Sequence, residues 1–258
     1  MTARREVLSF RHPLGGRLGI ADVTEIAGTL PASSIEQHLA ALPLVHPSGT
    51  VKRLRLPVSD VIDGRGGSPW WVMLGSLMEH EIGADAWSEA RPWTEPTASS
   101  ERGIRVRSTS LFVSSTGSVV PVHIDFQHNV LFQIDGAKDV TVSRAAQMER
   151  EIEKCIVAGS RNLEILPTES TTIRIEPGDG LYIPPFTPHW VTGRQDISIS
   201  LSCSWTTGRS EDEHLTRYWN AMQRRIGVRP RVPSAERKVD RAKASAVRLR
   251  SRLRRQKH

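Results

Sequence analysis

Three side chains that can bind a metal set the strongest constraint on how this chain can fold. His123 and Asp125 stand two positions apart in the segment PVHIDF, and His189 ends the segment GDGLYIPPFTPH much later in the chain. Because successive side chains of a strand alternate between its two faces, His123 and Asp125 point the same way if this segment is extended. The fold must then return the chain so that His189 lies beside them.

Two imidazoles and one carboxylate, with the other coordination positions left open, form the ligand set of non-haem Fe(II) oxygenases. We therefore take His123, Asp125 and His189 as candidate catalytic residues and metal ligands. The alternative is an inert group of hydrogen-bonded core residues. A divalent metal other than iron also fits, because selectivity among such metals depends on geometry and availability more than on ligand identity.

The sequence from about 105 to 205 is rich in short β-type segments. They are LFVSS, VVPVHI, VLFQI, DVTVS, TTIRI, GLYIP and ISISLSCSW, and turn residues separate them. This spacing predicts short antiparallel strands in a closed or sandwiched sheet. A helix is expected between two of the strands, over residues 148–157.

Further residues stand at fixed offsets from the ligands. Asn129, Gln133, Gly136 and Lys138 follow the first pair, and residues 178–184 precede His189. In these motifs the chain resembles the JmjC/cupin-like Fe(II)- and 2-oxoglutarate-dependent oxygenases over residues 105–205. It is most similar to the small branch that includes the asparaginyl hydroxylase of hypoxia-inducible factor.

The resemblance implies a mainly β fold, with a double-stranded β-helix (jelly roll or cupin) core, N-terminal α/β elements and C-terminal helices. It implies Fe(II), 2-oxoglutarate as cosubstrate, and dioxygen. Lys138, 15 residues after His123 and expected on the next strand, then pairs with the distal carboxylate of the cosubstrate. Asn129 then lies near the 2-oxoacid, and Ser202 takes the place of an Asn on the last core strand.

One position departs from the family pattern. Val120 stands where the family commonly has Thr or another hydroxyl that helps to bind the cosubstrate, three positions before the first His. Valine cannot donate that hydrogen bond. Thr109, Ser110 and Tyr182 are the candidates for a replacement, and the sequence does not rank them.

We expect four segments along the chain. Residues 1–104 form an α/β region packed on the core, 105–207 the jelly-roll catalytic core, 208–233 a C-terminal helix, and 234–258 a basic tail, either helical or disordered. Within the first segment we predict a helix from Ser34 to Leu42, a strand over 51–58 and a helix over 68–78. The Pro- and Ser-rich stretch 85–103 is expected to be a loop near the site entrance.

The C-terminal helices carry apolar residues that need a partner. Ser210 and Glu213 suggest a capping box, followed by an apolar face of Leu215, Tyr218, Trp219, Met222 and Ile226. A narrow stripe of Val239, Ala242, Ala246, Leu249 and Leu253 follows in the tail. In related enzymes such helices often form a dimer interface, so we expect a homodimer.

The net charge of +7 is concentrated in the tail. Residues 234–258 hold ten Lys/Arg and two acidic residues, a net charge of +8, so residues 1–233 carry a net charge of −1. Nucleic acid is a conceivable partner of this tail, but it is not favoured because the tail has no aromatic residues and no recognised motif. No apolar run is long enough to span a bilayer, so no membrane contact is expected, and we expect a cytoplasmic location.

The function expected from these features is hydroxylation of a C–H bond, with a protein or peptide side chain favoured as substrate over a small biosynthetic molecule. Demethylation is the less favoured outcome. Two alternatives from other classes stay open. One is a nucleic-acid-binding or regulatory cupin protein that uses its basic tail, and the other is a cupin enzyme that does not use 2-oxoglutarate. Lys138 distinguishes the last alternative, because only a carboxylate-bearing cosubstrate needs it.

Overall fold

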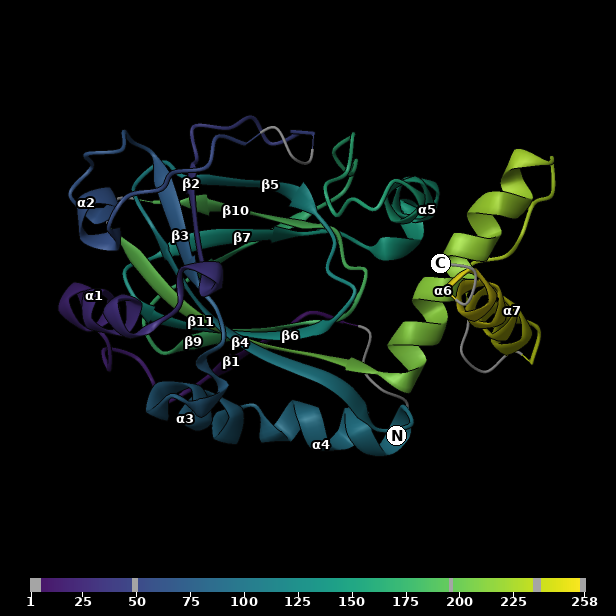
Figure 1. Cartoon of the computed structure of the whole chain (residues 1–258), viewed down its shortest axis with the longest axis horizontal. Coiled ribbons are helices and arrows are strands. Elements are labelled where there is room, and N and C mark those ends of the chain that lie inside the picture. The colour runs from purple at the N-terminus through teal and green to yellow at the C-terminus, as the bar shows by residue number, and fades with distance from the viewer. Residues whose placement is uncertain (1–5, 48–50, 195–196, 234–237, 256–258) are drawn as a thin grey trace.

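Two facing antiparallel sheets form the centre of the molecule (Figure 1). The computed structural model describes residues 6–47, 51–194, 197–233 and 238–255. The larger sheet has the strand order β1-β9-β6-β11-β4-β3-β2, and the smaller sheet has the order β5-β10-β7-β8. Most of the core strands pair with strands distant in the sequence, as in a jelly roll. The predicted fold class is confirmed.

The strands are β1 (Leu8–Arg11), β2 (Ile35–Leu39), β3 (Trp70–Leu74), β4 (Ile104–Ser114), β5 (Val119–His123), β6 (His128–Asp135), β7 (Lys138–Val142), β8 (Thr171–Ile175), β9 (Asp179–Ile183), β10 (His189–Gly193) and β11 (Ser198–Thr207). The helices are α1 (Ile20–Thr29), α2 (Val58–Ile62), α3 (Glu81–Glu89), α4 (Arg91–Ser100), α5 (Glu149–Val157), α6 (Gly208–Arg225) and α7 (Lys238–Arg255). Helix α5 confirms the helix expected between strands. No helix of the described residues is long and apolar enough to cross a membrane.

The larger sheet has an apolar outer face, and its inner face is largely polar along β11, whose residues alternate between apolar and polar types. On the outer face, Leu111, Phe132 and Trp205 are fully buried in one cluster with residues of α1 and α3. Helices α3 and α4 lie along this outer side (Figure 1). The intervening residues of β4 and β11 include several serines, and Ser110 stands opposite Ser202 in the register. The interior of the jelly roll is therefore polar on this wall.

The smaller sheet closes the interior from the other side. Its inward residues Val140, Val142 and Ile175 cluster with Leu181 and Ile183 of the larger sheet. Its outward residues, among them Val122 and Trp190, form a separate cluster with the apolar side of α5. Each sheet thus has its own outer core, and strand β5, which carries His123, is packed against α5.

The N-terminal predictions were wrong in four places. Residues expected to begin a helix at Ser34 form the strand β2, which pairs with β3. The helix expected over 68–78 is instead β3, in which Trp70, Val72 and Leu74 alternate with less buried neighbours. The segment of β3 is a strand because it pairs with β4, and a central position in a sheet outweighs local helix propensity.

The strand expected over 51–58 reduces to one bridge between His38 and Arg53, and Val58 already begins α2. The loop expected over 85–103 consists mostly of the helices α3 and α4. Pro92 lies in the first turn of α4, where a proline needs no hydrogen bond, whereas Pro96 lies inside the helix and removes one backbone donor without ending it.

The C-terminal helices bury different faces from those expected. Thr207, not Ser210, is the N-cap of α6. The buried face of α6 is polar and includes Asp212, Glu213, Thr216, Arg217 and Asn220, whereas Ile226 of the predicted apolar face is 78% exposed. In α7, Asp240, Ala244 and Val247 are buried, and the predicted stripe leaves Val239 and Leu249 exposed, while the side chain of Leu253 lies outside the described residues. Ion pairs, not an apolar seam, decide how these helices pack.

Leu111 and Val106 of β4 offer a matched pair for testing the outer core. Leu111 is fully buried and Val106 is 53% exposed. We expect Leu111→Ala to lower the free energy of unfolding by about 2–5 kcal/mol, and Val106→Ala by at most about 0.5 kcal/mol. Urea denaturation with an unchanged m-value measures both. Equal effects of the two substitutions would contradict the assignment of the outer face.

Candidate metal centre

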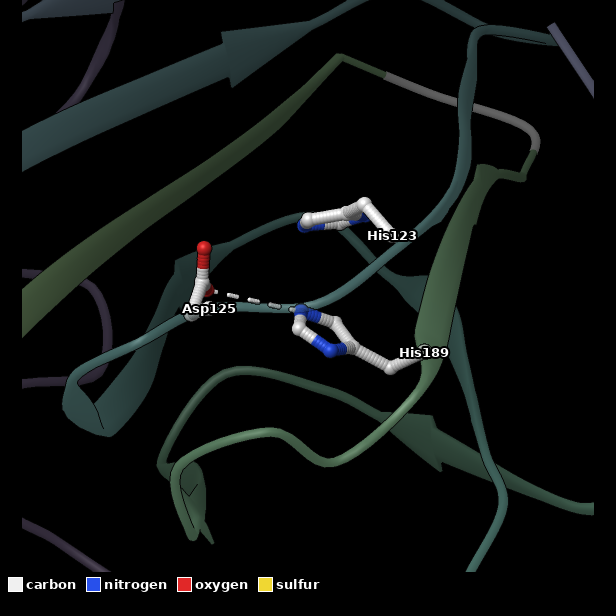
Figure 2. Close-up of side chains that lie close together, drawn as sticks. All are labelled: His123, Asp125 and His189. Atoms are coloured by element: carbon white, nitrogen blue, oxygen red, sulfur yellow. Dashed lines mark ion pairs between the residues drawn. The ribbon is translucent and has the colours of Figure 1, made fainter. Parts of the chain in front are cut away.

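The three predicted ligands come together at one end of the smaller sheet. His123 is the last residue of β5 and His189 the first of β10, and the antiparallel register pairs them directly. Their ring centroids lie 4.1 Å apart. One ligand atom from each of His123, Asp125 and His189 lies within 4.8 Å of the others, and Figure 2 shows the three side chains converging. This is a spacing that one metal ion can bridge.

Backbone carbonyls orient both imidazole rings for metal binding. Nδ1 of His123 lies 2.8 Å from the carbonyl oxygen of Pro121, and Nδ1 of His189 lies 2.9 Å from that of Thr187. A carbonyl oxygen only accepts, so each Nδ1 must carry the hydrogen. The lone pair is therefore on Nε2 in both rings, which is the tautomer that a metal ligand needs.

The electrostatics of the site keep the ligands in their metal-binding forms. Burial, and then the neighbouring His189, lower the pKa of His123 to about 4, so this ring is neutral at physiological pH. Burial alone would raise the pKa of Asp125, but His123, His189, Arg161 and a hydrogen bond from Asn129 together lower it. The site therefore presents two imidazoles and one carboxylate, the donor set that suits Fe(II) and similar divalent ions.

Asn129 and Ser202 form a chain that ends at the carboxylate of Asp125. The side chain of Asn129 donates to Asp125, and its Oδ1 accepts a hydrogen bond from Oγ of Ser202 at 3.0 Å. Ser202 lies on β11, in the sheet that faces the metal ligands. Both predicted residues are thus brought to the site, and both act on the orientation of Asp125.

Lys138 points into the interior of the jelly roll, on the same side of β7 as Val140 and Val142. Only 4% of it is exposed. Within the described part of the chain, no carboxylate or acceptor pairs with its ammonium group, and burial lowers its pKa to about 8. A buried ammonium without an anionic partner is costly, so this position is suited to an anionic ligand.

The structure ranks the candidates for the hydroxyl missing at Val120. A β-bulge between Val120 and His123 brings both side chains to the inner face. Tyr182 lies on the outer face, where its hydroxyl bonds Nδ1 of His128 at 2.8 Å, and Thr109 faces Met78 outside. Only Ser110 lies on the inner wall, opposite Ser202.

Arg161 is a site residue that the sequence did not reveal. Its Nη1 donates to Oδ1 of Asp125 at 3.1 Å, while 62% of its side chain is exposed. The backbone of this segment pairs with the end of β5, because Ile124 N–H donates to the Arg161 carbonyl and Leu163 N–H to that of Val122. The two segments lie far apart in the sequence and form no regular strand pair, so no local sequence pattern predicts the contact between Arg161 and Asp125.

Phe186 links the metal ligands to helix α6. Its N–H donates to the carbonyl of Asp125 at 2.7 Å, and its backbone has a φ of 62°, a strained conformation for a residue with a side chain. The Arg217 guanidinium stacks 4.0 Å from its ring centroid, and Arg217 is itself paired with Glu149 of α5. Two helices thereby hold the loop that precedes His189.

A pocket of about 240 Å³ lies beside the ligand strand. It is lined by Phe126, Thr206, Ser210, Glu211, His214 and Leu215. Oγ1 of Thr206 and Nδ1 of His214 are buried there without a hydrogen-bond partner among the described residues. Burial and the charge of Arg217 lower the pKa of His214 to about 4, so its ring is neutral. The pocket wall beside Phe126 thus holds two buried hydrogen-bonding groups that have no partner among the described residues.

Fold and ligands together define a jelly-roll protein with a two-histidine, one-carboxylate metal centre. Residues 94–212 match the family model described as the JmjC domain. This match agrees with the resemblance that the motifs around His123 and His189 indicated. No curated protein sequence matches the chain significantly.

Solved structures of Escherichia coli YcfD share the fold. One matches with a TM-score of 0.54 and 18% identity, covering 96% of this chain and 64% of YcfD. The ribosomal oxygenase YcfD in complex with cobalt and 2-oxoglutarate matches with a TM-score of 0.52, 18% identity and coverages of 95% and 63%. Its complex with cobalt and succinic acid gives 0.52, 18%, 95% and 62%. This chain spans less than two thirds of the length of these relatives.

The stacking of Arg217 on the Phe186 ring holds the loop whose backbone N–H donates to Asp125, so the Phe186 side chain is expected to support metal binding. We expect Phe186→Leu to weaken Co(II) binding roughly tenfold, because partners that orient ligands typically contribute at that scale. Phe132→Leu is the control, since Phe132 is equally buried but lies in the outer core. Calorimetric titration with Co(II) measures both variants. Equal Co(II) affinities of the two variants would show that the Phe186 side chain does not support metal binding.

Proposed function

We propose that this protein is an Fe(II)- and 2-oxoglutarate-dependent oxygenase that hydroxylates a C–H bond. The observation that carries the proposal is the buried ammonium of Lys138, which has no partner among the described residues and lies inside the same jelly roll as His123, Asp125 and His189. A metal-binding cupin without a dicarboxylate cosubstrate has no need of that charge. The YcfD structures with cobalt and 2-oxoglutarate, or with succinic acid, support the proposal by their shared fold.

Each inner residue has a role in this proposal. His123, Asp125 and His189 hold Fe(II), and Lys138 binds the distal carboxylate of 2-oxoglutarate. Asn129 and Ser202 keep the Asp125 carboxylate in position. Ser110, on the inner wall, supplies the hydroxyl for cosubstrate binding that Val120 cannot supply. The bound iron and cosubstrate supply the oxidising chemistry: substrate C–H, dioxygen and 2-oxoglutarate give substrate C–OH, succinate and carbon dioxide. The protein excludes water and fixes the geometry.

We propose a protein or peptide side chain as the substrate. The pocket beside Phe126 supports this, because it is about the volume of one large side chain and offers the unpartnered Thr206 hydroxyl and His214 imidazole. That YcfD is a ribosomal oxygenase points in the same direction. A small biosynthetic molecule is the second choice for this pocket. Reaction in the cytoplasm is part of the same proposal.

Lys138 tests the cosubstrate directly. We expect Lys138→Ala to raise the KM for 2-oxoglutarate at least tenfold in substrate-free turnover, measured as succinate formed by NMR. Wild-type KM should rise as the pH passes above about 8, because the ammonium loses its charge there. The variant should lack this rise.

The exposed Lys52→Ala is the matched control and should leave the KM unchanged. Full succinate production by Lys138→Ala would favour a cupin enzyme that does not use this cosubstrate. Iron-dependent oxidation without any succinate would do the same.

We also propose that α7 supports a homodimer. Val239 is 64% exposed and Leu249 is 60% exposed. Both belong to the apolar stripe of α7, whose spacing is typical of a helix–helix contact. We expect light scattering at 0.3 M salt, which screens the basic helix, to give twice the mass of the chain. Val239→Glu with Leu249→Glu should give the monomer mass. A wild-type monomer at 50 micromolar would contradict the dimer.

A further inference from the structure

Positive charge is concentrated at one end of this molecule. Residues 224–258 contain fourteen Lys/Arg and two acidic residues, a net charge of +12, so residues 1–223 carry a net −5. Eleven of the fourteen cations are arginines. Helices α5, α6 and α7 gather at the same end of the molecule, beyond the edge of the two sheets (Figure 1). The asymmetry in sequence is therefore also an asymmetry in space.

A groove of about 690 Å³ between α5 and the end of α6 collects part of this charge. It is lined by Arg150, Glu153, Lys154, Val157, Ala158, Ala221, Arg224, Arg225, Gly227, Val228 and Arg229. Glu153 is the one acidic residue among them, and it is 1% exposed and paired with Arg224. The groove therefore has an excess of cations and no acidic group available to solvent.

Three cations of the groove are free to bind a ligand. Arg150, Arg225 and Arg229 are exposed, and none of them forms an ion pair with a described acidic residue. By contrast, Lys154 is paired with Glu151. Unpaired exposed arginines retain their full charge and their planar fork of donors, which fits the oxygens of a phosphate.

Helix α7 extends the cationic surface. Its inner side uses Arg248 and Lys243 for packing against α6, through an ion pair with Asp212 and a hydrogen bond to Asn220. Lys238 and Arg250 are exposed and have no ion pair among the described residues. We call Arg150, Arg225, Arg229, Lys238 and Arg250 together the basic face. It spans three helices, so it suits an extended anion better than a single small one.

We propose that the basic face binds a nucleic-acid duplex through its phosphate backbone. Arginine predominates, the cations are spread over separate helices, and residues 224–258 contain no aromatic side chain that could stack on unpaired bases. Binding is therefore electrostatic and independent of base sequence. The sequence of the basic tail alone did not favour nucleic acid as a partner. The cationic groove between α5 and α6 is a second, separate observation in its favour. The proposal does not depend on the oxygenase activity.

The test uses the full chain and fluorescein-labelled 24-base-pair duplexes of RNA and DNA in fluorescence anisotropy between 50 and 300 mM KCl. We expect binding at 50 mM, with log K falling against log salt at a slope of about −4 to −5 for five contacts. Arg150→Glu, Arg225→Glu and Arg229→Glu combined should weaken binding at least tenfold and make the slope shallower by about 3.

The matched control reverses three exposed cations outside the basic face, Lys52→Glu, Arg53→Glu and Arg55→Glu. It changes the net charge equally and should shift the affinity by less than twofold. Equal losses in both triple variants would overturn the proposal, since net charge alone would then explain binding. So would the absence of duplex binding at 50 mM KCl, or binding to phosphatidylglycerol vesicles or polyglutamate that duplexes do not compete away. Circular dichroism confirms that the variants are folded.

Discussion

The register between strands β5 and β10 is the constraint on which the metal centre depends. It places His123 opposite His189, and a slip of one residue would turn one ligand to the opposite face of the sheet. Strand β7 pairs with the other edge of β10, and Phe186 holds the backbone of Asp125. The ligands are thus fixed by backbone hydrogen bonds before any metal binds, which reduces the conformational entropy that binding would otherwise cost.

The separation of apolar and polar packing leaves room for chemistry inside the jelly roll. The outer faces of both sheets bury large apolar side chains under helices, so only part of the interior is filled by an apolar cluster. The inner wall of the larger sheet can then hold serines together with Asn129, and Lys138 can stay without a partner among the described residues. The same arrangement explains why α6 buries a polar face: its ion pairs with α5 hold the loop before His189.

The sequence predicted the parts of the structure that repeat locally or match a family motif. The core strands and the shared direction of His123 and Asp125 follow from alternation and spacing, whereas the expectation for Lys138 came from the family resemblance. Strands β2 and β3 could not be predicted, because β3 pairs with the distant strand β4 and β2 pairs with β3, and this pairing overrides their helical pattern. Arg161 and Phe186 reach Asp125 through loops, and the buried face of α6 depends on charges contributed by α5. Such partners are defined only in three dimensions.

An anaerobic titration of the metal-free protein with Fe(II), followed by 2-oxoglutarate, tests the central claim most directly. The account predicts a visible charge-transfer band from a 2-oxoacid chelated to iron, which saturates at one equivalent and is absent in Asp125→Ala. Iron binding without the band would contradict the role assigned to Lys138 and the inner wall. Failure to bind any metal would show that the triad of His123, Asp125 and His189 is not a metal centre.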